Sequence, residues 1–190
     1  VKSKMIIWST TLLDFFSTFF ASATALLPIF AENILHVGPM GFGFLYAAPS
    51  IGAVLAGYIL AHMGTIKHQG KILLASVAMY GAATMVFGFS KLFALSFFAL
   101  FLIGIGDSIS IVIRSTIRQL TTPDYIRGRM SSVNMIFSMG GPQLGAFQAG
   151  VLAAAVGGPL SVVIGGVGAL AVTAIIATKI PALRNYSGEK

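Results

Sequence analysis

The sequence contains no cysteine, and this absence removes several kinds of chemistry at once. Without thiols the chain has no disulfide framework, no zinc site of the cysteine type and no thiol nucleophile. Its three histidines are not spaced with a carboxylate as a metal-binding motif requires, and no glycine-rich phosphate loop precedes a Lys and a Ser or Thr. We therefore expect no enzyme activity, no bound metal and no cofactor.

Charged residues are also scarce, at 9% of the chain, whereas 56% of the residues are hydrophobic and the mean hydropathy is +0.91. A soluble domain carries about 25% charged residues, so this composition cannot cover a surface in water. The expected surroundings are the lipid bilayer. The net charge of +7 does not predict nucleic-acid binding, because the basic residues lie in short loops and form no basic face with interleaved aromatic residues.

Six apolar stretches approach the roughly 20 residues that a transmembrane helix needs. Glycine, proline and polar turn residues separate them, and such short connections make neighbouring helices antiparallel. The stretches do not alternate with a period of two residues, which argues against a closed barrel. The predicted fold is all-α, with six membrane-spanning helices at residues 5–30, 42–63, 72–89, 93–113, 130–153 and 160–180.

Lys and Arg residues are distributed unevenly between the two ends of these helices. Of the twelve, only Lys91 falls at the end opposite the others. The side rich in Lys and Arg is the cytoplasmic side. We therefore expect a multi-pass protein of the cytoplasmic (inner) membrane, with both termini and the loops at 64–70 and 119–128 in the cytoplasm.

Polar residues recur at spacings of three and four on the first, fourth and fifth predicted helices, so each set forms a stripe along its helix. A polar stripe inside a bilayer must face protein or water. The first and fourth helices are therefore expected to line an aqueous cavity. The third and sixth carry no acid or amide and are expected to face lipid. The stripes comprise Thr10, Asp14, Ser17, Thr18 and Ser22; Asp107, Ser110, Arg114 and Arg118; and Asn134, Ser138 and Gln148.

This arrangement repeats after three helices, because a polar first helix and an apolar third helix occur twice. Three is an odd number, so the two triplets have opposite orientations in the membrane. The predicted fold is thus two inverted three-helix repeats, a pattern typical of transporters whose substrate site lies at the repeat interface.

Small residues also punctuate the helices. Gly52 and Ala56, like Ala146 and Gly150, lie four apart and would let helix backbones approach closely. We interpret these pairs as ordinary membrane packing. The Gly-Gly-Pro segment at 140–142 predicts a bend, and both a gating hinge and a static kink remain open at this stage.

One further pattern consists of short segments spread along nearly the whole chain. They are Leu13-Asp14, Ala25-Leu26-Leu27-Pro28, Ile34-Leu35-His36-Val37-Gly38-Pro39, Gly106-Asp107 through Arg114, Thr122-Pro123-Asp124-Tyr125-Ile126-Arg127-Gly128-Arg129, Ser132-Val133-Asn134 and Gln143-Leu144-Gly145. In these segments the chain resembles the C-terminal half of the branch of the major facilitator superfamily that contains enterobactin-exporter-like proteins and related drug efflux carriers.

The resemblance implies twelve helices in two six-helix bundles. Residues 1–190 would form a single bundle that supplies helices seven to twelve, and the first bundle would be absent; a start at Val1 rather than Met agrees with a piece of a longer protein. The chain departs from the family at 64–71, which lacks the acidic and arginine residues of the best-known loop motif. It also departs at 146–149, where the branch commonly carries acids.

The polar stripes and the fourth connection supply the candidate site residues. After Pro123, Asp124 suits the positive end of a helix dipole. Arg127 and Arg129 would lie at headgroup depth, where lipid-phosphate anchoring and a latch against the missing bundle both remain open. The predicted substrate and proton pathway contains Thr10, Asp14, Thr18, Asp107, Arg114 and Asn134, and the predicted cytoplasmic gate contains Arg118, Asp124, Arg127 and Arg129.

Two acids lie deep within predicted helices, where an unpaired carboxylate is costly. Arg114 shares a helix face with Asp107 and is its candidate partner, although about 10 Å separates them along the axis. Asp14 has no basic residue on its own helix. We expect Asp14 to couple transport to protons or to contact substrate, and Asp107 with Arg114 to form a structural or gating set. Alternatively, both acids hydrate a passive cavity, or Asp14 contacts the missing bundle.

These observations predict a proton-coupled exporter of small amphipathic organic molecules, of the drug or siderophore type. The chain would be half of the translocation unit, and its partner would be the missing N-terminal six-helix bundle or a second copy. One bundle alone has nothing to rock against, and alternating access requires such a movement. The alternative is therefore a non-transporting truncated remnant or a membrane assembly subunit.

Overall fold

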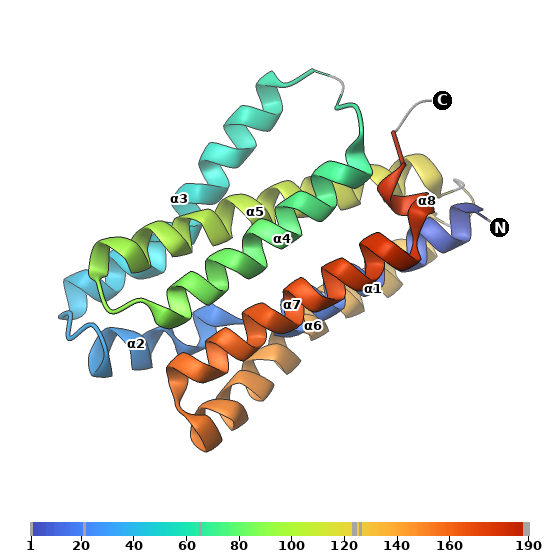
Figure 1. Cartoon of the computed structure of the whole chain (residues 1–190). Helices are drawn as coiled ribbons and strands as arrows, with labels where there is room; N and C mark the ends of the chain where they lie inside the picture. Colours follow the sequence, from blue (N-terminus) through green and yellow to red (C-terminus); the bar gives the residue numbers. More distant parts are fainter. Residues whose placement is uncertain (1, 21, 65, 123–124, 126, 188–190) are drawn as a thin grey trace.

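The computed structural model describes residues 2–20, 22–64, 66–122, 125 and 127–187. Within these ranges the regular structure is helical (Figure 1). The elements are α1 (Lys2–Phe20), the 3₁₀ helix η1 (Ala23–Leu26), α2 (Leu27–Asn33), α3 (Pro39–His62), α4 (Gln69–Phe89), α5 (Phe93–Thr121), α6 (Arg127–Val156), α7 (Gly158–Lys179) and α8 (Pro181–Arg184).

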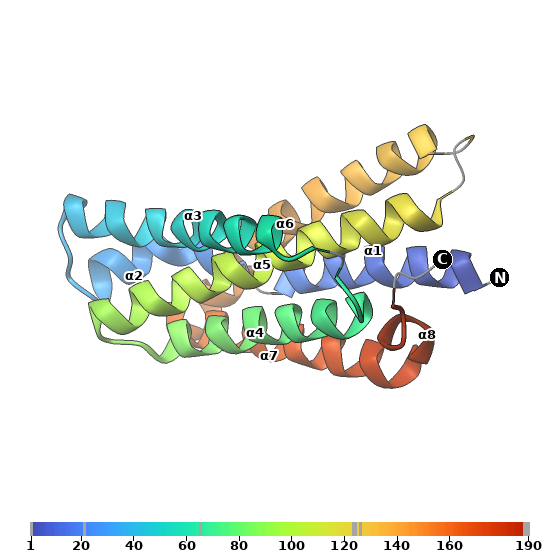
Figure 2. The same cartoon turned by 90° about the horizontal axis from the view of Figure 1, so that it is seen from above.

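Helices α1, α4, α5 and α7 lie side by side along one common direction, and α3 is inclined to them (Figures 1 and 2). α4 packs against α5 and α7, α3 packs against α5, and α1 packs against α6 and α7. The start of α1, the short helix α8 and the α3–α4 connection lie at one end of the bundle, and the α2–α3 and α4–α5 connections lie at the other (Figure 2). Successive membrane-spanning segments therefore run antiparallel, as the short connections predicted, and α2 continues the direction of α1 within the first segment (Figure 2).

Five segments are long and apolar enough to cross a membrane by length and composition: Ile7–Asn33, Pro39–His62, Gln69–Phe89, Phe93–Thr121 and Gly158–Lys179. α6 is not among them although it has 30 residues, because amides, serines and glycines interrupt its apolar positions. It lies against α1 and α7 for much of its length (Figure 1). The predicted all-α membrane fold of a six-helix half-bundle is confirmed, with α6 as its polar member.

The first predicted helix, at 5–30, is broken rather than continuous. Helix α1 ends at Phe20, and the chain resumes as η1 and α2. Pro28 is the second residue of α2 and has no N–H to donate to Thr24, so an uninterrupted helix would lose a hydrogen bond there. Ser22 has a non-helical backbone, and its hydroxyl donates to the carbonyl of Thr18 at 2.8 Å. This bond satisfies one of the carbonyls that a helix end leaves free.

The short helix α2 is held in place by an aromatic contact. Phe30 is fully buried and stacks on Phe87 of α4, with ring centroids 4.4 Å apart. Leu27 and Ala31 are buried beside it. The segment after the break is therefore part of the core at its end of the bundle, and the break does not leave α2 loose.

The apolar helices α4 and α7 pack on each other as well as facing outward. Gly81 and Gly166 lie at their crossing, where a Cβ on Gly166 would stand 2.8 Å from the carbonyl oxygen of Gly81. About half of the apolar part of α4 is buried, compared with 22% of that of α3. The expectation that these two helices simply face lipid is thus incomplete, because uniform apolarity also suits a buried helix pair.

Glycines also bring α3 and α5 together. A Cβ on Gly104 would collide with the backbone of Pro49, and a Cβ on Gly52 would collide with the carbonyl oxygen of Phe101. The predicted close packing at Gly52 is confirmed by this contact. Since backbone atoms cannot move aside as a flexible side chain can, these two glycines fix the distance between the helices.

This crossing can be tested with Gly104→Ala. We expect it to destabilise the protein by about 1–3 kcal/mol, because the added methyl overpacks the helix contact. Gly57→Ala on α3 is the matched control, since a Cβ there meets nothing within 4 Å and alanine favours the helix by about 1 kcal/mol. Thermal unfolding of the purified protein in detergent measures both. Equal melting temperatures for Gly104→Ala and the unmodified chain would contradict the crossing.

Because the chain has no cysteine, single cysteines can report which end of the bundle faces which side of the membrane. Positions His36 and Lys91 lie in the connections at one end, and His68 and Tyr125 lie at the other. We expect a membrane-impermeant maleimide added outside the cell to label positions 36 and 91 and to leave 68 and 125 unlabelled, as the Lys and Arg asymmetry predicts. The reverse labelling would show that the orientation is wrong.

Candidate functional site

A buried ion pair joins α1 to α5 near the middle of the bundle. Arg114 Nη1 lies 2.5 Å from Asp14 Oδ1, and the two side chains are 2% and 6% exposed. Arg114 is among the largest fully buried side chains of the described chain. Removing two charges from water is costly, and close contact between them offsets part of that cost. The pair therefore holds α1 and α5 at a defined separation.

The third participant comes from α6. The hydroxyl of Ser138 donates to the second carboxylate oxygen of Asp14, Oδ2, at 2.8 Å. One carboxylate thus binds a cation on α5 with one oxygen and a hydroxyl on α6 with the other. Within the described part of the chain, Nε of Arg114 is buried without a hydrogen-bond partner, so the network is not fully satisfied.

Arg114 pairs with Asp14 and not with Asp107, which corrects the pairing predicted from helix spacing. Asp107 and Arg114 share a face of α5 but are seven residues, or about 10 Å, apart along its axis. The approach of α1 brings Asp14 much closer. Asp107 is half-buried and makes no ion pair with any residue that the structure describes.

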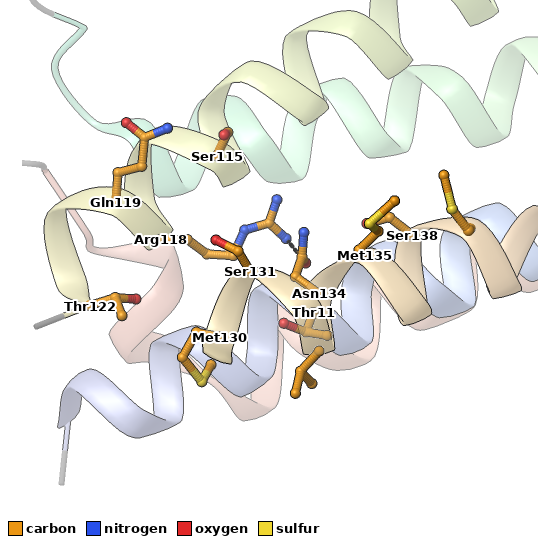
Figure 3. A pocket seen from close by; sticks show the side chains of 12 residues that line it. Thr11, Ser115, Arg118, Gln119, Thr122, Met130, Ser131, Asn134, Met135 and Ser138 are labelled. Carbon is orange, nitrogen blue, oxygen red and sulfur yellow. Dashed lines mark hydrogen bonds between the residues drawn. The ribbon is translucent and has the colours of Figure 1, made fainter. Parts of the chain in front are cut away.

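One turn beyond Arg114, α5 makes a second polar contact with α6. Nη1 of Arg118 donates a short hydrogen bond to Oδ1 of Asn134 (Figure 3). Both side chains are half-buried. The amide of Asn134 is neutral, so this bond orients the guanidinium of Arg118 without cancelling its charge.

Two cavities lie beside these contacts, with volumes of about 380 and 290 Å³. The smaller one is bordered by Asp14, Thr18, Asp107, Ile111, Arg114, Ser115, Arg118, Asn134, Ser138 and Pro142. The larger one, shown in Figure 3, is bordered by α1, α5 and α6. Its lining residues are Thr11, Ser115, Arg118, Gln119, Thr122, Met130, Ser131, Val133, Asn134, Met135, Ser138 and Met139.

The predicted site residues divide between the cavities, the helix interior and the undescribed segment. Thr10 is fully buried, borders neither cavity, and its hydroxyl donates to the carbonyl of Ile7 at 2.9 Å. Asp124 lies outside the described residues. Arg127 and Arg129 belong to the start of α6, but their side chains also lie outside the described part. The other predicted residues border at least one cavity: Asp14, Thr18, Asp107, Arg114, Arg118 and Asn134.

Close packing of α6 on α1 depends on a glycine pair that the sequence analysis did not single out. A Cβ on Gly141 would approach Thr18 Oγ1 to 2.6 Å, and a Cβ on Gly145 would approach the carbonyl of Phe19 to 2.6 Å. By contrast, Gly150 of the predicted pair has nothing within 4 Å. The spacing Gly141-x-x-x-Gly145 is readable in the sequence, but the sequence analysis considered only a bend at 140–142. α6 remains helical through this segment.

A double-mutant cycle tests the ion pair. Arg114→Gln and Asp14→Asn should each destabilise the protein by about 3–5 kcal/mol, because each leaves a buried charge without its partner. The double variant should cost less than the sum of the two, since it removes both charges together. Thermal unfolding in detergent gives the three values, with Lys91→Gln, an exposed loop position, as the control. Additive costs would show that the two residues do not interact.

Comparison with known proteins extends these observations to nearly the whole chain. The family described as transmembrane secretion effector, within the major facilitator superfamily, matches residues 6–188. The chain is 26% identical over 184 residues to the enterobactin exporter EntS of Citrobacter koseri, covering 97% of this chain and 44% of that protein. It is 25% identical over 169 residues to EntS of Shigella dysenteriae and of Escherichia coli K12, covering 89% of this chain and 40% of each.

The chain thus spans less than half the length of these curated relatives. The match runs through all the long helices and includes the residues of both cavities. It agrees with the all-helical membrane fold and with the resemblance seen in the sequence motifs. The chain belongs to the transmembrane secretion effector family of the major facilitator superfamily, a family of transporters rather than enzymes.

Proposed function

We propose that this chain forms half of the translocation unit of a proton-coupled exporter, which carries small amphipathic organic molecules across the cytoplasmic membrane. The observation that carries the proposal is the buried ion pair between Asp14 and Arg114, which lies beside a cavity. Charges inside a membrane protein are costly and mark ion and substrate pathways. A bundle that served only as a structural element would be at least as stable with apolar residues in place of Asp14 and Arg114.

Protonation of Asp14 gives the pair a second state. Arg114 keeps its charge at any physiological pH, so the charge of the contact depends on Asp14 alone. With Asp14 ionised, the pair holds α1 against α5; with Asp14 protonated, the attraction is lost and the two helices are free to separate. A contact between helices that depends on one proton can drive a change in their packing.

The carrier would be completed by a second six-helix bundle, either the missing N-terminal half or a second copy. Helices α3 and α6 expose large apolar side chains, which lipid or a second bundle would cover. The described residues that line the larger cavity come from α1, from α5 with Thr122 directly after it, and from α6. The exposed residues include Phe44, Tyr46, Ile51 and Val54 on α3 and Met135, Ile136, Met139 and Phe147 on α6.

The type of substrate is supported by both the cavity and the relatives. The larger cavity combines hydroxyl, amide and guanidinium groups with methionine side chains, which suits molecules that have an apolar body and a polar group. The relatives are described as enterobactin exporters, which supports cargo of the siderophore or drug type.

The cytoplasmic gate is proposed at the end of α5 and the start of α6, in Arg118, Asp124, Arg127 and Arg129. Arg118 lies in the last turn of α5 and contacts Asn134 of α6. The positive-inside asymmetry supports a cytoplasmic position for this end of the bundle and for both termini.

The proposal is tested by proton-driven efflux from vesicles that contain the complete carrier. We expect Asp14→Asn to abolish efflux driven by a pH gradient while leaving downhill substrate exchange, because the variant binds no proton at this position. A loss of at least about tenfold, equivalent to 1.4 kcal/mol, is expected in the driven rate. Normal gradient-driven efflux by Asp14→Asn would show that the coupling role is wrong.

Two further variants separate coupling from stability. Asp14→Asn combined with Arg114→Gln leaves no buried charge unpaired and should also lose coupling. Glu32→Gln, an exposed acid on α2, should transport normally. If Asp107→Asn loses coupling and Asp14→Asn keeps it, Asp107 and not Asp14 carries the proton.

A further inference from the structure

We propose that the larger cavity is a binding site for anionic amphipathic molecules, in which Arg118 recognises the anionic group and the methionines of α6 contact the apolar body. This inference rests on the proposed transport function and deepens it by fixing the charge of the cargo. It depends on three observations. The lining of the cavity carries a positive charge, methionines form part of its wall, and the neighbouring Arg114 is already paired with Asp14.

The charge balance of the cavity is positive. Among the lining residues that the structure describes, Arg118 is charged and none is acidic. Its bond to Asn134 uses a neutral acceptor, so the positive charge is oriented but not neutralised. A guanidinium has five N–H donors, and the contact with Asn134 uses one terminal nitrogen. The remaining donors suit the two oxygens of a carboxylate or a similar anion.

The neighbouring charges leave Arg118 as the anion-binding group. Arg114, one turn away, is already in contact with Asp14 and is 2% exposed. Asp107 lies eleven residues before Arg118, or about 16 Å along α5, and borders the smaller cavity alone. Arg118 also borders the smaller cavity, where Asp14 and Asp107 lie, so the expected preference for an anion applies to the larger cavity, whose described lining residues include no acid.

The wall opposite Arg118 is formed by Met130, Met135 and Met139 of α6. Methionine is unbranched and polarisable, so it adapts to apolar groups of different shapes. Met135 and Met139 are more than half exposed, and Figure 3 shows Met130 and Met135 on the same helix as Asn134. A volume of about 380 Å³ is sufficient for a drug-sized molecule, since ligand pockets begin near about 300 Å³.

The chain carries its own spectroscopic reporter beside this cavity. Trp8 is the single tryptophan, it is 58% exposed, and it precedes the cavity residue Thr11 by three positions on α1. Residues three apart on a helix share a face. Energy transfer from Trp8 to a dansyl group therefore reports a dansyl compound bound in the cavity.

The experiment compares two probes with the same fluorophore and opposite charge. The full 190-residue chain, in nanodiscs of zwitterionic phosphatidylcholine, is titrated with dansylglycine, an anion, and with dansylcadaverine, a cation. We expect dansylglycine to bind at least about tenfold more tightly, the size expected for one charge-assisted hydrogen bond. Equal binding of the two probes, tighter binding of the cation, or no saturable transfer with either probe would overturn the inference.

Variants assign the preference to Arg118. Arg118→Gln should lose the about tenfold preference, and Arg118→Lys should retain most of it because the charge remains. Arg184→Gln, an exposed arginine of α8 at the same end of the bundle, should behave as the unmodified chain. A preference that survives Arg118→Gln would overturn the inference. Because equilibrium binding needs no gradient, these outcomes are independent of efflux. Charge-selective binding without transport would contradict the proposed function alone, and transport together with equal binding of the two probes would contradict this inference alone.

Discussion

The contact between Asp14 and Arg114 constrains the positions of three helices, because the same carboxylate also accepts a hydrogen bond from Ser138. Apolar packing alone would allow α1, α5 and α6 to slide past one another at little cost in lipid, where there is no hydrophobic driving force between helices. The ion pair and the hydroxyl require one register. The glycines at 141 and 145 then let α6 approach α1 closely enough for Ser138 to reach the carboxylate.

Much of the fold could be predicted from the sequence, because a bilayer leaves few choices. Backbone groups must be paired internally, so long apolar runs become helices, and short connections fix their order. The break between α1 and α2 was harder to predict, since Pro28 lies close to the end of a run that is long enough to cross the membrane as one helix. The packing of α4 on α7 could not be read from composition, because a helix that is apolar on all sides suits both lipid and a buried partner.

The sequence predicted which residues belong to the site better than it predicted the contacts between them. Helical spacing identified Asp14, Arg114 and Asn134 as residues of polar stripes. Spacing within one helix does not predict which stripe of another helix it contacts. Arg114 was therefore matched with Asp107 of its own helix, whereas the structure brings Asp14 closer. The methionines beside Arg118 were missed for a related reason: on a membrane helix an apolar residue gives no sign of whether it meets lipid or a cavity.

The break in the first helix divides one membrane-spanning segment into two arms, α1 and α2, which pack against different helices. The longer arm, α1, is tied to α5 and α6 through Asp14 and lies against α7. The shorter arm, α2, is tied to α4 through the stacked rings of Phe30 and Phe87. A continuous helix would transmit any tilt of one end directly to the other, since it behaves as a rigid rod. Because the backbone of Ser22 is not helical, the two arms have separate anchors and do not form one rod.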